Sequence, residues 1–309
     1  MNIIVFPGQG SQNIGMGKDL SDNFAEAKQV FEEVNDALNF NLTRVMWDGT
    51  DKEIALTSNA QPALMACSIA TLKVLNKITN KNLSDLACYV CGHSLGEYSA
   101  MTAAEVFSLS QCATLLRLRG DAMQKAVPIG KGAMAALIGT NIEMAVKVID
   151  KVKRYGVCDI ANDNSQGQVV ISGDILAVEN AMKFSKDFGI KKAILLPVSA
   201  PFHCKLMRPA QIIMEEALNK LNFKTPLIPI ISNVNVLPEN NPDKLRKNLI
   251  DQVTGTVRWR ETMEFAEKKG IKKIIELGSG KVLTGIAKRM IKDIVTINIE
   301  NTEDYNNLI

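Results

Sequence analysis

The stretch CGHSLGEYSA, residues 91–100, decides the fold, because it places Ser94 between Gly92 and Gly96. The apolar segment 86–91 before it has the length of a buried strand, and the alanine-rich segment 97–105 after it is typical of a helix. A serine at such a strand-to-helix turn fits the G-x-S-x-G nucleophile elbow. The alternative is a glycine-rich turn whose serine only caps the helix. The flanking segments favour the nucleophile.

A helix that begins at this turn presents unpaired N–H groups and the positive end of its dipole to the serine. The N–H of Leu95, the residue after Ser94, is therefore the expected first donor of an oxyanion hole.

Outward from the elbow, strand patterns alternate with helix patterns. We expect strands at 2–6, 86–91, 228–232, 273–277 and 295–299. Helices are expected between them, at 22–39, 60–77, 108–126, 206–221, 243–253, 258–269 and 281–291. This alternation predicts an α/β protein with a doubly wound, mostly parallel sheet.

The pattern changes between residues 128 and 199. Strand and helix signals there follow the order β-α-β-β-α-β, with a turn-rich Asn-Asp-Asn-Ser at 162–165 between the second and third strands. This order is typical of a ferredoxin-like unit. We therefore expect an inserted ferredoxin-like subdomain at 128–199 and a catalytic subdomain formed by 1–127 and 200–309.

Composition excludes several classes of function. The 309 residues are 46% hydrophobic and 22% charged, with a formal net charge of +3, so no large nucleic-acid footprint is expected. No apolar stretch has the length of a membrane span. The first residues, MNIIVFPGQG, lack the basic leader and long apolar run of a signal peptide, and we expect a cytoplasmic protein. Six scattered cysteines predict free thiols, and with only two histidines no metal site is expected.

A nucleophilic serine needs a base, and the chain has only His93 and His203. His93 is adjacent to Ser94, and neighbouring side chains at such a turn point apart. His203 lies in the loop 199–204, where the inserted unit returns to the main sheet. His203 is therefore the candidate base. No acid that would complete a triad is evident.

Arg119 interrupts the apolar stripe of the helix expected at 108–126, whereas Arg117 lies on another face and is expected to be solvated. A guanidinium on a core-facing stripe needs an anion, and its fork matches a carboxylate. One interpretation is an internal salt bridge. The other is a substrate whose acyl group carries a free carboxylate.

Together these residues resemble the malonyl-CoA:acyl carrier protein transacylases (S-malonyltransferases) of type II fatty-acid synthesis, over nearly the whole chain. The motifs that carry the resemblance are FPGQGSQ (6–12), AQPA (60–63), GHSLGE (92–97), Arg119-Gly120, GAM (132–134), GQVVISG (167–173), APFH (200–203), Gln252 and GKVLTG (280–285). The usual Gly-Pro-Gly of the family is Gly278-Ser279-Gly280 here, which should change loop rigidity more than chemistry.

The resemblance implies an α/β-hydrolase-like large subdomain and a role for each site residue. Ser94 would carry the acyl group, His203 would be the base, and Arg119 would bind the malonyl carboxylate. Gln9 and the Leu95 N–H would form the oxyanion hole. A backbone carbonyl at Gln252 would orient the histidine. The residues expected to line the cleft are Gln61, Met123, Asn162 and Phe202.

The implied substrates are malonyl-CoA and the acidic holo-acyl carrier protein, which binds transiently, with no cofactor and no metal, and the enzyme would be a monomer. Two lysine clusters are candidates for docking the carrier: Lys183, Lys186, Lys191 and Lys192, and Lys268, Lys269, Lys272 and Lys273. The alternatives are a serine thioesterase or esterase with the same elbow and a scaffold with a relict site. A hydrolase would be expected to carry its histidine late in the chain, whereas roughly a third of this chain follows His203. The complete set of site residues argues against the relict site.

Overall fold

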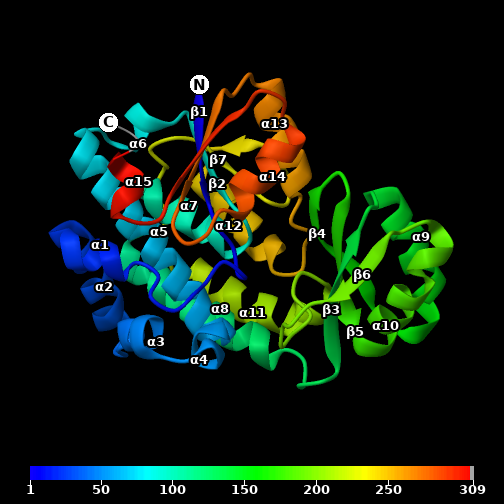
Figure 1. Cartoon of the computed structure of the whole chain (residues 1–309). Coiled ribbons are helices and arrows are strands. Elements are labelled where there is room, and N and C mark those ends of the chain that lie inside the picture. Colours follow the sequence, from blue (N-terminus) through cyan, green and yellow to red (C-terminus); the bar gives the residue numbers. More distant parts are fainter. Residues whose placement is uncertain (307–309) are drawn as a thin grey trace.

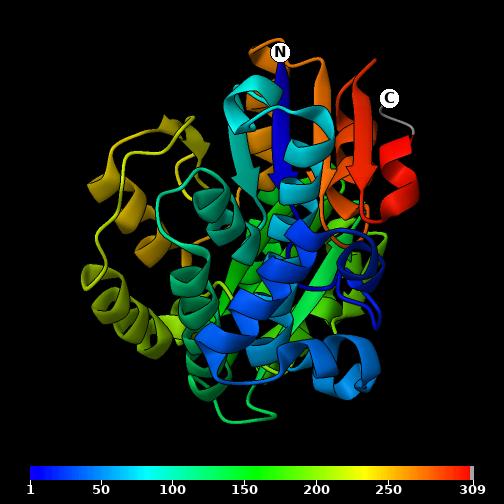
Figure 2. The same ribbon diagram turned by 90° about the vertical axis from the view of Figure 1, so that its left-hand side faces the viewer.

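The computed structural model describes residues 1–306 and contains two sheets (Figure 1). The strands of the six-stranded sheet are β1 (Asn2–Phe6), β2 (Tyr89–Gly92), β7 (Ile230–Ile231), β8 (Pro238–Glu239), β9 (Lys273–Leu277) and β10 (Val295–Ile299). They lie in the order β10-β9-β1-β2-β7-β8, and every pair of neighbours is parallel except β7 and β8. Figure 2 shows β1 in blue between the cyan β2 and the orange β9.

The main body has helices on both faces of this sheet and further helices packed on those. They are α1 (Lys18–Asn23), α2 (Ala25–Leu38), α3 (Leu42–Asp48), α4 (Asp51–Ala55), α5 (Thr57–Thr79), α6 (Leu83–Leu86), α7 (Leu95–Ala103), α8 (Leu109–Lys125), α11 (Arg208–Asn219), α12 (Pro242–Gln252), α13 (Trp259–Lys268), α14 (Val282–Met290) and α15 (Thr302–Asn306), with the 3-10 turn η3 (Lys205–Met207). Successive residues of β1 point to opposite faces. Ile4 and Phe6 enter the core beneath α5, α7 and α8, whereas Ile3 and Val5 pack with α13 and α14.

The second sheet has four antiparallel strands in the order β4-β5-β3-β6. Its elements are β3 (Gly132–Ile138), α9 (Ile142–Val152), η1 (Lys153–Tyr155), β4 (Cys158–Ser165), β5 (Gln168–Asp174), α10 (Ile175–Phe184), η2 (Ser185–Phe188) and β6 (Lys192–Leu195). Its apolar core, formed with α9 and α10, is separate from the two cores of the main sheet. We call this part, residues 132–195, the four-stranded unit.

Some predicted boundaries were wrong. The turn expected at 162–165 is the end of β4, whose pairing with β5 shifts register after Ile160 and after Asp163. A bulged strand accommodates the polar residues that sequence alone assigned to a turn. The strand expected from residue 86 begins at Tyr89, because α6 occupies Leu83–Leu86. The helices α3 and α4 were not predicted.

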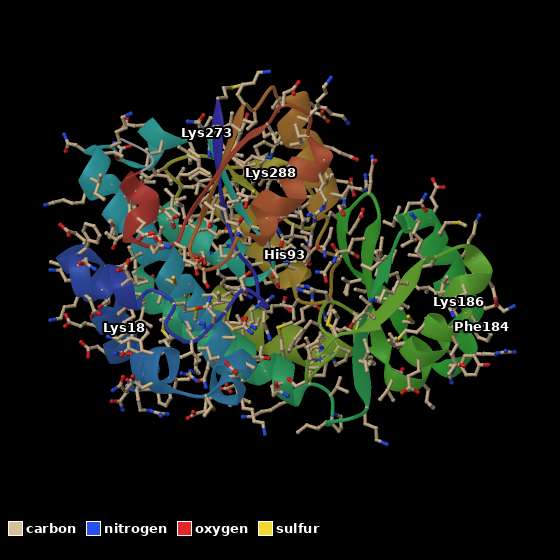
Figure 3. All side chains as sticks on the ribbon, in the orientation of Figure 1. Lys18, His93, Phe184, Lys186, Lys273 and Lys288 are labelled. Atoms are coloured by element: carbon tan, nitrogen blue, oxygen red, sulfur yellow. The ribbon has the colours of Figure 1, made fainter. Side chains whose placement is uncertain are left out.

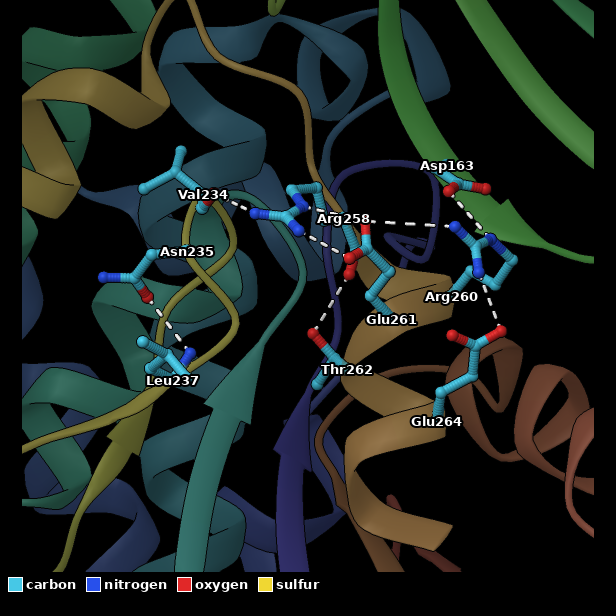
Figure 4. A network of polar contacts seen from close by, with 9 residues as sticks. All are labelled: Asp163, Val234, Asn235, Leu237, Arg258, Arg260, Glu261, Thr262 and Glu264. Carbon is cyan, nitrogen blue, oxygen red and sulfur yellow. Dashed lines mark hydrogen bonds and ion pairs between the residues drawn. The ribbon is translucent and has the colours of Figure 1, made fainter. Parts of the chain in front are cut away.

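Polar contacts join the four-stranded unit to the main body (Figure 4). Asp163 on β4 is 1% exposed and accepts a hydrogen bond of 2.8 Å from Nε of Arg260 on α13, which also pairs with Glu264. The backbone N–H of Asp163 donates to the carbonyl of Val257, and the N–H of Val257 donates to Ala161. These contacts fix β4 beside the main body, next to the loop that follows α12.

Candidate active site

The elbow holds Ser94 in a strained backbone conformation between β2 and α7. Ser94 has φ 54° and ψ −110°, a combination that non-glycine residues rarely adopt. A Cβ on Gly92 would lie 2.0 Å from the backbone of Gly96, and a Cβ on Gly96 would lie 2.3 Å from the carbonyl oxygen of Phe6. Both glycines are therefore required by the close approach of β1, β2 and α7, as the G-x-S-x-G pattern predicts.

Ser94 and His203 meet although 109 residues separate them in sequence. The Oγ of Ser94 lies 2.8 Å from Nε2 of His203, and Nδ1 of His203 lies 2.9 Å from the backbone carbonyl oxygen of Gln252. A carbonyl only accepts, so Nδ1 carries the proton and Nε2 is free to accept the serine proton. No carboxylate of the described residues bonds this histidine.

Burial keeps the imidazole neutral. His203 is 4% exposed, and burial together with the nearby positive charge of Arg119 lowers its pKa to about 3. The hydrogen bond to Gln252 acts in the opposite direction. A neutral imidazole that accepts from a serine hydroxyl is the form required of a general base.

Arg119 lies beside the serine and is only 1% exposed. Its Nη2 donates to Ser94 Oγ at 3.2 Å and to Gln252 Oε1 at 2.9 Å, and its Nη1 donates to Gln61 Oε1 at 2.8 Å. Its Nε has no partner among the described residues, and no carboxylate there lies within ion-pair distance of it. Arg119 therefore forms no direct salt bridge within the described residues, and its guanidinium, hydrogen-bonded to neutral partners, faces the nucleophile.

Gln252 links these groups through both its backbone and its side chain. Its Nε2 donates to the carbonyl of Ser94 at 3.0 Å and to the buried carboxylate of Glu97 at 2.7 Å. Asn233 completes the network: its Oδ1 accepts from the N–H of Ser94 at 2.8 Å, and its own N–H donates to Glu97 at 3.1 Å. The network holds the elbow, the arginine and the histidine carbonyl in one arrangement.

The two expected oxyanion donors lie at the elbow. Leu95 is the first residue of α7, so its N–H has no acceptor inside the helix. Gln9 lies in the loop after β1, and its Nε2 donates to Thr57 at 3.4 Å instead of contacting Ser94. The neighbouring Gly8 passes so close that a Cβ there would lie 2.7 Å from the carbonyl oxygen of His93. The loop that carries Gln9 therefore runs directly over the elbow.

Of the four residues expected to line the cleft, some contact the site residues and one forms no hydrogen bond with them. Gln61 bonds Arg119 and also lies 3.9 Å from the sulfur of Met123, so both are joined to the arginine. Phe202, 8% exposed, immediately precedes the base. Asn162 is buried on β4, where its backbone bridges to Val257, and its side chain forms no hydrogen bond with Ser94.

Sequence reasoning missed three polar residues: Glu97, Asn164 and Asn233. Asn164 Oδ1 lies 2.9 Å from Nε2 of His93, which turns away from Ser94, as predicted for adjacent side chains. Figure 3 places His93 near the junction of the main body with the four-stranded unit. Asn233 could have been found, since it follows β7, and polar residues after the carboxyl ends of parallel strands gather at one edge of a sheet.

Arg117 is half-buried instead of solvated. It donates to Asn59 at 2.6 Å and stacks on Phe40 at 4.7 Å. Within residues 1–306 no cluster of metal-binding side chains is found, all six cysteines are free, and no helix is long and apolar enough to cross a membrane.

Comparison with known proteins identifies the family. The model of the acyl transferase domain matches residues 3–305. The chain belongs to the acyl transferase family. A Bacillus subtilis relative named malonyl CoA-acyl carrier protein transacylase is 40% identical over 300 residues, 97% of this chain and 93% of that protein.

Solved acyl transferases share the whole fold. The acyl-carrier-protein S-malonyltransferase of Bartonella henselae is 48% identical, with a TM-score of 0.97 over 99% of this chain and 98% of its own. A malonyl-transacylase solved in complex with a type II polyketide acyl-carrier protein is 38% identical, with a TM-score of 0.95 over 99% of this chain and 98% of its own. The α/β architecture, with a mostly parallel sheet and a separate antiparallel sheet, is therefore that of this acyl transferase family.

Proposed function

We propose that the chain moves a malonyl group from coenzyme A to the phosphopantetheine thiol of an acyl carrier protein, for fatty-acid synthesis, through an ester on Ser94. The observation that carries this proposal is the meeting of three side chains. Ser94 Oγ lies 2.8 Å from the base His203 and 3.2 Å from the buried guanidinium of Arg119. The relatives named for this reaction, 40% identical over nearly the full length, support it.

In the first half-reaction Ser94 attacks the thioester carbonyl of malonyl-CoA while His203 Nε2 accepts the serine proton. The N–H of Leu95 and the amide of Gln9 stabilise the oxyanion. Collapse of the tetrahedral intermediate expels CoA, whose sulfur takes the proton from His203. In the second half-reaction the carrier thiol gives its proton to His203 and attacks the Ser94 ester. His203 then returns the proton to Ser94 Oγ as the bond to the serine breaks, and the carrier leaves as the malonyl thioester.

The carbonyl of Gln252 takes the place of a triad acid. It fixes the tautomer of His203 by accepting from Nδ1, but it brings no negative charge to stabilise an imidazolium. The base therefore stays a weak one, with a lowered pKa. A weak base suits attack by a thiol, which loses its proton far more readily than water does. This difference favours transfer to a carrier thiol over hydrolysis.

Arg119 selects the acyl group. A guanidinium has five N–H donors, and three hydrogen bonds here join two of its nitrogens to neutral partners. The bond to Ser94 Oγ is replaced when the serine is acylated. The carboxylate of a malonyl ester lies two bonds from its carbonyl carbon, and so within reach of the freed N–H. A serine thioesterase or esterase would use the same Ser94–His203 pair but would give Arg119 no role.

The cleft is lined, in this proposal, by Gln61, Met123, Asn162 and Phe202. Phe202 is packed against the core just before His203, and its ring would crowd an α-methyl branch on the acyl chain. The reaction needs no cofactor, since each bond made or broken belongs to the thioester, the serine or the thiol.

The carrier docks, we infer, on the first lysine cluster. Lys183, Lys186, Lys191 and Lys192 line a groove beside the exposed Leu195. Figure 3 shows Lys186 on the outer side of the four-stranded unit, and β6 leads from this groove toward the loop of His203. The second cluster is disfavoured, because Lys273 begins β9, whereas Ser94 follows the carboxyl end of the parallel β2.

We also propose the finer structural classification. Residues 128–199 form a ferredoxin-like subdomain, supported by the order β3-α9-β4-β5-α10-β6 and the sheet order β4-β5-β3-β6. Residues 1–127 and 200–309 form the α/β-hydrolase-like catalytic subdomain, supported by the elbow between β2 and α7. A monomer in the cytoplasm stays a prediction.

An acceptor test decides between transferase and hydrolase. The protein is incubated with malonyl-CoA alone, with free pantetheine, or with holo-acyl carrier protein, and the products are separated by mass. A transferase keeps the malonyl group on the protein until a thiol is added and then passes it to that thiol. Release of malonate to water at the rate of thioester consumption would show a thioesterase instead.

A further inference from the structure

Glu97 is a buried carboxylate that the proposed mechanism does not use. It lies on α7 three residues after the nucleophile and is 0% exposed. Its Oε2 accepts from Gln252 Nε2 at 2.7 Å and from the N–H of Asn233 at 3.1 Å. Its Oε1 has no partner among the described residues. A buried carboxylate with one unpaired oxygen has an unfilled position for a proton or a charge.

One amide separates this carboxylate from Arg119. The guanidinium donates to Oε1 of Gln252, and Nε2 of the same amide donates to Glu97. The guanidinium thus has a negative counter-charge nearby that does not occupy the N–H groups facing Ser94. Within residues 1–306 no ion pair of Arg119 is found, so Glu97 is the acid that the network connects to it.

The other groups around Glu97 are neutral at ordinary pH. Cys91 from β2 and Tyr98 from α7 itself both have raised pKa values, chiefly through burial. The loop after β7 places the neutral Ser232 beside the carboxylate and supplies Asn233 as a donor, and α12 supplies Gln252. Of the other elements packed against α7, β1 has no titratable residue, and α5 presents its two lysines to solvent. Besides Arg119, α8 carries Cys112, and α5 carries Cys67; burial raises the pKa of both thiols.

Arg119 is the positive charge that favours the ionised form of Glu97. Burial raises the pKa of Glu97 above that of a free carboxylate, and its hydrogen-bond donors and the positive charge of Arg119 offset only part of that rise. A substrate carboxylate bound to the guanidinium neutralises the positive charge of Arg119. The ionised form of Glu97 is then less favourable, and its pKa rises further. Two carboxylates that share one cation in a dry site hold a proton more tightly than one does.

We propose that Glu97 is the counter-ion of Arg119 and takes up a proton when an acyl group with a free carboxylate occupies the cleft. This inference rests on the proposed function, since it takes the malonyl carboxylate to bind Arg119. The proton comes from solvent and sits on Oε1, and Oε2 keeps its two donors. Glu97 thereby makes the selectivity for malonyl over acetyl groups depend on pH.

Proton counting during acylation tests the proposal. Below the thiol pKa, formation of the Ser94 ester conserves protons, because the proton of the serine ends on CoA. In weakly buffered indicator solution, malonyl-CoA added without an acceptor should draw up to one proton per adduct from solvent at pH values above the resting pKa of Glu97. Acetyl-CoA should draw none. Intact mass of the same samples counts the adducts, so a missing adduct, which contradicts the proposed function, is distinguished from a missing proton.

Glu97→Gln is the matched variant, because its amide oxygen can keep the two donors at the position of Oε2. It should form the malonyl adduct without proton uptake. The ratio of kcat/KM for malonyl-CoA to that for acetyl-CoA should fall by up to ~10-fold per pH unit in the wild type above the resting pKa of Glu97, and stay constant in the variant. Glu105→Gln, a change at an exposed position, should behave as the wild type.

Two results would overturn the proposal. One is equal proton stoichiometry for malonyl and acetyl adducts of the wild-type protein, which needs no variant to be measured. The other is malonyl-specific uptake that persists in Glu97→Gln, which would assign the proton to another group such as His203.

Discussion

Replacement of Arg119 by alanine separates a malonyl transferase from a general serine acyltransferase. The side chain is 1% exposed and 3.2 Å from the nucleophile, and it forms three hydrogen bonds to Gln61, Gln252 and Ser94. Its removal leaves a malonyl carboxylate without a partner in a poorly hydrated cleft. The reaction of acetyl-CoA, which has no carboxylate, loses nothing comparable.

The magnitude follows from burial. Truncating one partner of a buried, hydrogen-bonded charge pair costs about 2–5 kcal/mol. At about 1.4 kcal/mol for each factor of ten, kcat/KM for malonyl-CoA should fall roughly 30-fold to several thousand-fold. For acetyl-CoA it should stay unchanged or rise, because this substrate has no carboxylate to bind the guanidinium that is lost. Arg119→Lys should restore little, since an ammonium cannot form the bidentate fork.

The assay is steady-state transfer to pantetheine from each thioester, with Arg117→Ala as the control. Arg117 lies on the same helix, is half-buried and bonds Asn59 away from the serine. Its removal should affect malonyl-CoA and acetyl-CoA equally. The same equal loss in Arg119→Ala would refute the reasoning and make Arg119 a structural residue.

Three further predictions concern the base, the loop at Ser279 and the carrier. Burial and Arg119 lower the pKa of His203 to about 3. The rate of acylation should therefore not decline as the pH falls through 6.5, whereas it would decline there if the base were a free imidazole. Between pH 6.5 and 3 His203 takes up a proton in the unfolded state but stays neutral in the folded state. The free energy of unfolding should therefore fall as the pH is lowered through this range, and denaturant unfolding at a series of pH values measures it. Ser279→Ala removes the hydroxyl that donates to Ser11 and accepts from Asn13, and it should lower the unfolding free energy by about 1–3 kcal/mol without changing the malonyl-to-acetyl ratio; an altered ratio in that variant would contradict a purely structural role. Lys191→Glu should slow transfer to carrier protein at low salt but not to pantetheine, whereas Lys273→Glu should slow neither; equal salt sensitivity of the two acceptors would exclude steering by charge.

The sequence predicted the strand-turn-helix at Ser94 because the determinants are local. Gly92 and Gly96 are dictated by backbone contacts within a few residues and with β1. The choice of His203 as the base depended on elimination between two histidines, and the structure brings it to 2.8 Å from the serine. The apolar stripe around Arg119 showed that this side chain is buried, but left its partners open.

The polar network around the elbow could not be predicted, because it is formed by residues far apart in the chain. The backbone carbonyl of Gln252 bonds His203, and its side-chain amide bonds Arg119 and Glu97. No local sequence pattern in α12 predicts either contact. Asn164 was assigned to a turn, since the bulges that keep β4 extended depend on its pairing with β5. Long-range pairing decides such positions, and local propensity does not.

The central claim is that malonyl-CoA acylates Ser94, and intact-mass spectrometry tests it most directly. Protein incubated with malonyl-CoA in the absence of any thiol acceptor should gain the mass of one malonyl group, and peptide mapping should place it on Ser94. Ser94→Ala should gain nothing under the same conditions. A malonyl adduct that persists on Ser94→Ala, with Cys204 as the next nucleophile beside His203, would contradict the account.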